Sequence, residues 1–231
     1  MLLDNLVYEV LTEVREMSDD GQITEPFVKH LINVYRAKYI QQEYSKRNRV
    51  NQSSIQSFNL KLIPVDSSTM EGINTGSAIL ESPKLPNILN IAKRPAILRI
   101  RTLDAVKGEI AFQSVDRAKL SSYSKFKVIN AFLENNNKLY VVGTAPSAIL
   151  LKNISVDVVL ENPEEVYEFG FKDRLAGTRI EDYPIDLGMW AYVKQELIEH
   201  ILLSYKVPND NSNDQIDNKE VNEPKQQRRE R

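Results

Sequence analysis

The chain has 231 residues, 42% of them hydrophobic, and its 30 basic and 32 acidic residues give a formal net charge of −2. It contains no cysteine and two histidines, which excludes disulfides, zinc fingers, iron–sulfur clusters and thiolate catalysis, and leaves too few imidazoles for a His-rich metal site within one copy. The near-neutral charge does not fit a dedicated DNA-binding protein, which usually carries a basic surplus. No run approaches the roughly 18 to 20 apolar residues that a bilayer crossing needs, and a chain without cysteine suits a reducing cytoplasm.

Two helices are predicted in residues 1–50. In "LVYEVLTEVREM" the apolar residues recur at helical spacing, with Asp4 as the expected N-cap. The acidic start of this segment also argues against a secretory signal. "TEPFVKHLINVYRAKYIQQEYSKR" is predicted as a second helix to about Lys46, with Thr24 as its N-cap and Pro26 in its first turn. The "SDDG" between them ends in a glycine, which favours a helix end, so we expect an antiparallel helical hairpin.

Residues 51–185 are predicted to be mainly β. "FNLKLIPVD" alternates apolar and polar residues as a half-buried strand does, and Pro64 marks its edge or end. The Ser-, Gly- and Pro-rich stretch at 66–86 is predicted as a long loop, and such loops inside compact domains are usually functional or docked on a partner. Further strands are predicted in "AILRIRTLD", "GEIAFQSVD" and "NISVDVVLENP", and a short link or helix capped by Ser114 in "SVDRAKLSSYSKF". "VINAFLENNNKLYVVG" is predicted as a hairpin, because asparagines at a turn tolerate the left-handed conformation.

The segment "LGMWAYVKQELIEHILLSY" is predicted as a C-terminal helix over residues 186–205 that packs on the rest, with Asp186 as its cap. Val207–Pro208 ends it, and an extended polar arm at 206–231 follows. Helices at the two ends and strands between them indicate an α+β fold, with mainly antiparallel strands, rather than an alternating α/β fold.

No short motif for catalysis or cofactor binding occurs. The sequence lacks G-x-G-x-x-G, G-x-x-x-x-G-K-[ST] and G-x-S-x-G, so dinucleotide, P-loop phosphate and seryl-nucleophile chemistry have no support. His30 and His200 are interpreted as partly buried packing residues. Adjacent acids such as Glu164–Glu165 fit a solvated surface better than a hydrolase, whose two carboxylates must flank a bond at a set separation. We therefore expect no enzyme, no cofactor and no metal site.

Basic residues gather at two places outside the arm. Lys46, Arg47 and Arg49 follow the end of the second helix, where positive charge is favourable. The alternative is contact with nucleic-acid phosphate, as in a nucleic-acid-binding accessory protein that uses these residues and the arm. Arg99 and Arg101 lie on one face of a predicted strand, where they would make ion pairs across a subunit joint or simply face solvent.

The arm is the least ordinary segment. Its few apolar residues cannot offset a backbone entropy cost of roughly 1 to 2 kcal/mol per residue. Such a segment stays disordered, or it adds as a strand to the sheet edge of a neighbour and orders on binding. The residues expected to bind that partner are Ile216, Val221, Arg228, Arg229 and Arg231.

Several segments together resemble a known family. "VYEVLTEVREMSDDGQITEPFVKHLINVYRAKYI", "AILRIRTLD", "FQSVDRAKLSSYSKF", "AFLENNNKLYVVG" and "ISVDVVLENPEEV" are similar to virion structural proteins of crAss-like Bacteroidales phages, in particular to ring proteins of the head-to-tail connector. The resemblance spans about residues 5 to 205 and rests on segment order rather than on a short motif. It implies a twelvefold homo-oligomeric ring in the tail or neck of the virion, assembled in the host cytoplasm. It also implies contacts with the portal protein and neighbouring tail rings or hub proteins, and DNA passing through the centre.

Overall fold

The computed structural model describes residues 1–17, 23–103, 108–125, 129–143, 151–166 and 182–204. Backbone contacts divide them into two units. The helical unit comprises Leu2–Tyr35 and the residues from Leu187 onwards, and the β unit comprises Met1 and Arg36–Asp186. The two units are described separately below.

The helical unit is built from α1 (Leu3–Met17), the first part of α2 (Glu25–Arg47) and α5 (Leu187–Ser204). These helices confirm the two N-terminal helices and the C-terminal helix expected from apolar spacing. Their buried apolar residues lie at helical spacing and include Leu6, Val10, Val14, Val28, Leu31, Trp190, Val193, Leu197 and Ile201. The packing of α1 against α5 buries one stripe of each helix.

The helix starts agree with the sequence in two of three cases. α2 begins directly after Thr24, whose carbonyl accepts from the N–H of Val28 at 3.2 Å, and α5 begins directly after Asp186. The prediction for α1 is wrong by two residues. The carbonyl of Leu2 already accepts from the N–H of Leu6, so Asp4 lies inside the first turn, where its charge still complements the helix dipole.

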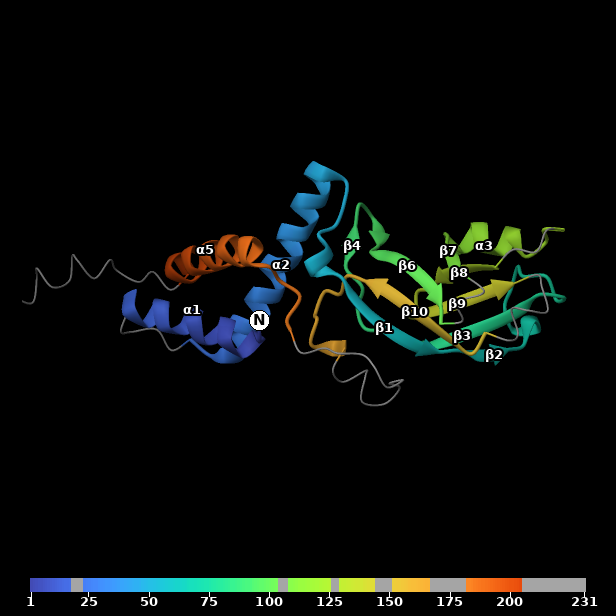
Figure 1. The fold of residues 1–231 in the computed structure, drawn as a ribbon, viewed down its shortest axis with the longest axis horizontal. Helices are drawn as coiled ribbons and strands as arrows, with labels where there is room; N and C mark the ends of the chain where they lie inside the picture. The colour runs from blue at the N-terminus through green and yellow to red at the C-terminus, as the bar shows by residue number, and fades with distance from the viewer. Residues whose placement is uncertain (18–22, 104–107, 126–128, 144–150, 167–181, 205–231) are drawn as a thin grey trace, which may run out of the picture. The chain divides into compact units, whose positions relative to one another are not determined.

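The β unit contains an eight-stranded sheet in the order β1-β10-β6-β7-β8-β9-β3-β2 among the described residues. Every pair is antiparallel except β7 with β8. The α+β fold with mainly antiparallel strands is therefore confirmed (Figure 1). The strands are β1 (Gln56–Lys61), β2 (Ile63–Val65), β3 (Ala78–Lys84), β6 (Ile97–Thr102), β7 (Glu109–Phe112), β8 (Ile129–Leu133), β9 (Lys138–Gly143) and β10 (Asn153–Val158).

The sheet curls because one stretch of chain serves both of its ends. β1 pairs with β10 and β2 pairs with β3, yet only Leu62 separates β1 from β2. The N–H of Leu62 donates to the carbonyl of Lys152 at 2.8 Å, which continues the β1–β10 ladder to the point where the β2–β3 ladder begins. Pro64 lies in β2, the last strand in the order. The sequence predicted an edge or end position for it, because proline has no N–H to donate to a neighbouring strand.

Smaller elements complete the β unit. The parallel neighbours β7 and β8 are connected through α3 (Val115–Ser121), which begins directly after Ser114 as expected. The 3₁₀ turns η1 (Gln52–Ser54) and η2 (Ser67–Thr69) flank the β1–β2 stretch. A two-residue ladder of β4 (Asn90–Ile91) with β5 (Arg94–Pro95) was not predicted. The hairpin of β8 and β9 was predicted. Asn137 at its turn has a φ of 59°, in the left-handed region.

The expected long loop at 66–86 is partly wrong, because residues 78–84 form β3. Ser82 and Pro83 indicated a loop, since proline cannot donate to a ladder. The structure accommodates Pro83 at a register shift in the β3–β9 pairing between Glu81 and Lys84. Bulges of this kind leave a residue outside the ladder.

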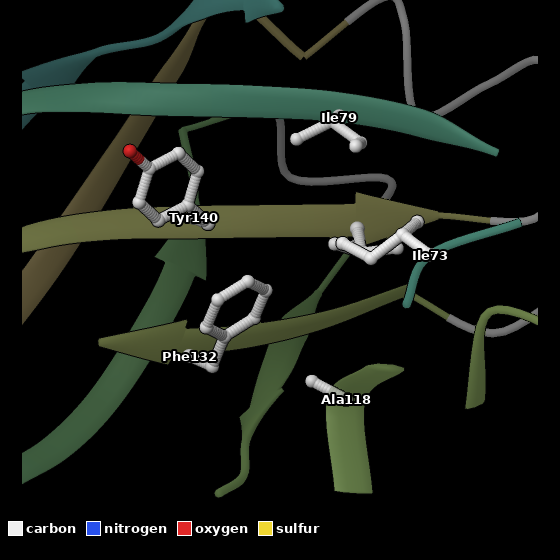
Figure 2. Close-up of a cluster of buried hydrophobic side chains, with 6 residues drawn as sticks. Ile73, Ile79, Ala118, Phe132 and Tyr140 are labelled. Carbon is white, nitrogen blue, oxygen red and sulfur yellow. The ribbon is translucent and has the colours of Figure 1, made fainter. Parts of the chain in front are cut away.

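β9 is buried along nearly its whole length because both of its faces are covered. One face contributes to a cluster beneath α3, in which Phe132 stacks on Tyr140 with ring centroids 5.5 Å apart. Figure 2 shows Ala118 of α3 directed at this cluster. By contrast, β1 and β10 alternate strictly between buried and more exposed residues, as the sequence predicted.

Candidate assembly interface

No site for small-molecule chemistry emerges from the described residues. In that part of the chain, no three His, Asp or Glu side chains gather closely enough to hold a metal ion. None of the helices there is sufficiently long and apolar to cross a membrane. The interpretation of the histidines as partly buried is wrong: His30 and His200 are both exposed, and the ring of His200 lies edge-on against Tyr35 at 5.9 Å.

The outward face of β1, β10, β6 and β7 carries a ladder of charged and polar side chains. Arg101 binds Asp157 through two contacts of 3.0 and 2.9 Å, and the Ser57 hydroxyl donates to the same carboxylate at 2.6 Å. Arg99 lies 3.7 Å from Glu109. The two arginines predicted on one strand face are thus paired within the chain. Exposed pairs of this kind contribute about 0–1 kcal/mol each to stability, so their main effect is to balance charge on this surface.

The structure places Lys46, Arg47 and Arg49 at and after the end of α2. Glu43, one turn earlier, lies 3.6 Å from Lys46 and 3.1 Å from Arg47. Glu43 offsets one of the three positive charges, so Lys46, Arg47 and Arg49 keep a local surplus of two, and the alternative of a phosphate-binding patch stays a prediction. Arg49 is exposed and follows Asn48, which has a left-handed φ of 53° at the helix end.

An open hollow of about 560 Å³ adjoins these residues. It is lined by Tyr39, Glu43, Arg47, Arg49, Val50, Asn51, Gln52 and Asp186. Asp186 accepts from the Asn51 amide and the Ser53 hydroxyl. Cations and carboxylates are both present in the lining, so the hollow favours neither an anionic nor a cationic ligand.

Arg36 is the largest side chain that is fully buried in the β unit. Its guanidinium donates to the carbonyls of Pro184 at 2.9 Å, Leu160 at 3.0 Å and Ser54 at 3.2 Å. It also lies over the Tyr183 ring, 5.7 Å from the centroid. Burial lowers the pKa of Arg36 and raises the pKa of Tyr183. Arg36 therefore holds together three segments that are far apart in sequence.

Sequence reasoning missed the role of Arg36, although a signal was present. Ile32 and Ile40, four residues before and after it on α2, are both buried. Residues at i−4 and i+4 share a helix face. An arginine between two buried isoleucines is therefore predicted to face an apolar interior, where it must find hydrogen-bond acceptors.

In the helical unit, Lys194 of α5 bridges two acids of α1. Its ammonium lies 2.8 Å from the Glu9 carboxylate and also contacts Glu13, while the Trp190 indole donates to Glu9 at 3.0 Å. The hydrogen bond from Lys194 holds the pKa of Glu9 below its ordinary value. Hydrogen bonds to Glu13 and Glu9 raise the pKa of Lys194. This cluster fixes the pairing of α1 with α5.

Lys194→Met is expected to reduce the pH dependence of the helical unit's stability. Because the pKa of Glu9 is lowered by folding, its contribution is present above its unfolded value near 4.5 and is lost as pH falls through the lowered folded value. The contribution of Lys194 is present at neutral pH and is lost as pH rises through its raised pKa. Thermal unfolding followed by circular dichroism between pH 3 and 8 tests this. Wild type should lose more stability than the variant on acidification, with Lys93→Met as an exposed control.

The residues predicted to bind a partner through the arm, Ile216, Val221, Arg228, Arg229 and Arg231, lie outside the described residues. The expected end of the last helix at Val207–Pro208 lies outside them as well.

Comparison with known proteins gives two results. Residues 5–219 match the family described as phage tail ring protein 2. The chain is also 29% identical over 171 residues to "Ring protein 2" of Bacteroides phage crAss001, an alignment that covers 73% of this chain and 74% of that protein. The family match begins inside α1, includes the described residues of both units and extends into the arm.

Proposed function

Because the chain belongs to the phage tail ring protein 2 family, and is therefore a structural tail ring protein of a crAss-like phage, we propose that it forms a ring of the head-to-tail connector. The family match over residues 5–219 carries this proposal, and it confirms the resemblance drawn from the sequence. In the proposed assembly the ring joins the portal protein to the tail and surrounds the DNA path. Each copy contacts the next through unlike surfaces, an arrangement that closes into a ring when the rotation permits.

The paired arginines of the β unit support a position beside DNA. Arg99, Arg101 and Arg47 all have acidic partners within the chain. Binding to DNA phosphate depends on releasing counterions through uncompensated cations. Arginines that already have acidic partners would retain passing DNA less than unpaired arginines would. We infer a twelvefold ring, assembled in the host cytoplasm, with further contacts to neighbouring rings or hub proteins.

The arm at 206–231 is proposed to order against a neighbouring protein of the connector. Its acidic first part and its basic end, which holds Arg228, Arg229 and Arg231, give it two surfaces of opposite charge. Ile216 and Val221 supply the apolar contacts. A segment that folds on binding loses its conformational entropy only when the connector assembles. The arm would therefore act as a tether inside the particle and not in the free chain.

Deletion of residues 206–231 is expected to abolish stable association with the portal protein while leaving the melting temperature within a few degrees of wild type. The deleted segment has three aliphatic side chains, Val207, Ile216 and Val221, so its removal takes away little apolar surface. Negative-stain images and analytical ultracentrifugation of the chain mixed with portal protein would measure ring formation, and circular dichroism would measure stability.

The full-length chain is the control for this deletion. If neither chain forms rings with portal at micromolar concentration, the proposed connector role is wrong. If both chains form them equally well, the connector role stands and the arm is not the tether.

A further inference from the structure

The turn between β4 and β5 is an exposed part of the β unit that carries two adjacent cations. Ile91 pairs with Arg94, so the turn itself consists of Ala92 and Lys93. The side chains of Lys93 and Arg94 are both exposed. Among the described residues, neither of them has an ion-pair partner. The turn therefore presents two uncompensated positive charges to solvent.

The backbone of this turn is unfavourable for the residues that form it. φ is 49° at Ala92 and 64° at Lys93, which are the left-handed values of a type I′ hairpin turn. Such turns favour asparagine and glycine, because a residue with an ordinary Cβ is strained in this conformation. Turn geometry therefore does not explain a lysine at position 93. Strain of this kind points to a function of the side chain, and the exposed group of Lys93 is its ammonium.

α2 and β4 advance in the same direction along the β unit. Near the base of the hairpin, the Arg36 guanidinium donates to the carbonyl of Leu160, and Leu160 forms a bridge with Ile88. Further along, the Gln41 amide donates to the carbonyl of Asn90 at 3.0 Å. These two levels are about 7.5 Å apart along the helix, at about 1.5 Å per residue, and about 6.6 Å apart along the strand, at about 3.3 Å per residue. Figure 1 shows α2 and the β4–β5 turn extending toward the same side of the β unit.

Continuing both segments brings the β4–β5 turn level with the end of α2. Ala92 lies two residues beyond Asn90, an advance of about 6.6 Å, which matches about four residues of helix. Four residues beyond Gln41, α2 is in its last turn. Three exposed basic residues at the end of the helix and two at the turn thus lie at one end of the β unit. We call these five residues the basic edge: Lys46, Arg47, Arg49, Lys93 and Arg94.

The basic edge keeps a positive surplus after its acidic neighbours are counted. Glu43 pairs with the two cations in the last turn of α2, and Asp186 lines the hollow beside that turn. Against five basic residues, these two carboxylates leave a net charge of +3. On the hairpin side, Glu165 accepts from the N–H of Asn87 at 3.0 Å. Asn87 precedes Lys93 by roughly 20 Å of extended chain, which exceeds the Debye length of about 8 Å.

We propose that the basic edge binds the phosphates of double-stranded DNA in the path through the ring. The inference rests on the proposed ring and names the residues of each copy that face the path. Unpaired cations gain affinity for DNA by releasing its condensed counterions, whereas Arg99 and Arg101 are already paired with acids on the outer sheet face. Repetition of the basic edge around a ring makes many weak contacts act together. Phosphate contacts carry no sequence information, so we expect binding to any duplex sequence.

Titration of the full-length chain against a short fluorescent DNA duplex tests this proposal. The test variant combines Lys93→Asn with Arg94→Gln. We expect its affinity for the duplex to fall at least about tenfold at low salt, and the slope of log K against log salt to shrink by about two. The melting temperature should stay equal or rise, because asparagine tolerates the left-handed turn better than lysine does. Stability and affinity then move in different directions, which excludes misfolding as the cause.

The matched control combines Lys152→Asn with Arg117→Gln, which removes two exposed cations elsewhere on the β unit and changes the net charge equally. It should bind DNA within about twofold of wild type. Equal losses in the test and control variants would show that total charge governs binding, and would overturn the inference. So would undetectable binding of the wild-type chain at low salt. A polyglutamate peptide that binds as tightly as the duplex would assign the basic edge to an acidic protein, which also contradicts the proposal.

Ring formation on portal protein, imaged by negative stain for the same chains, separates this inference from the connector role. The test variant should form rings as wild type does, because the change affects exposed side chains at one end of the β unit. If rings form and the test variant binds DNA as the control does, the inference is wrong and the connector role stands. If no chain forms rings, the connector role is wrong and this inference fails with it.

Discussion

Arg36→Met is expected to lower the free energy of unfolding of the β unit by about 3–5 kcal/mol. Methionine fills much of the same space but offers no donor. The carbonyls of Ser54, Leu160 and Pro184 would each lose the hydrogen bond that they now receive from the guanidinium. A hydrogen bond to a charged group contributes about 1.5–3 kcal/mol net, so the loss of three outweighs the relief of burying a weakly hydrated cation.

Urea unfolding followed by fluorescence and circular dichroism would measure this effect. Arg36→Lys should recover only a small part of the stability, because one ammonium cannot reach carbonyls on three separate segments. Arg117→Met, at an exposed position on α3, is the matched control and should stay within about 0.5 kcal/mol of wild type. A midpoint for Arg36→Met equal to that of the control would mean that the three contacts are not made in solution.

Local pattern was sufficient to predict most of the elements. The stripe of Leu6, Val10 and Val14 indicated α1, and the alternation around Phe58 and Leu60 indicated β1. Both patterns arise from the repeat of the element itself, so neighbouring residues contain the information. β3 was missed because Ser82–Pro83 has the composition of a loop, and only its pairing with β9 reveals the bulge that accommodates the proline.

The closure of the sheet could not be predicted, because it depends on pairings between distant segments. Nothing near Leu62 in sequence shows that β1 joins β10 while β2 joins β3. The same holds for the candidate interface. Arg99 and Arg101 were placed on one strand face, but their partners Glu109 and Asp157 come from two other strands.

Phe132→Ala is expected to lower the free energy of unfolding of the β unit by about 3–5 kcal/mol. Phe132 is fully buried in the cluster that also contains Ala118 of α3, Ile73 and Ile79 (Figure 2). The substitution removes a whole ring and its stacking on Tyr140, and it leaves a cavity that the surrounding strands β8 and β9 cannot fill. Large-to-small substitutions in such positions cost both the lost transfer free energy and the cavity.

The effect should be concentrated on α3, since that helix covers the cluster from one side only. Hydrogen exchange of the α3 amides should accelerate more than exchange in β1, whose pairing with β10 lies on the other half of the sheet. Phe132→Leu keeps most of the apolar volume and should lose about half as much stability or less. Leu120→Ala is the control, because that side chain is 73% exposed on the outer face of α3. Equal exchange rates in α3 and β1 for Phe132→Ala would show that the cluster does not anchor this helix separately, and that the β unit loses stability as one cooperative body.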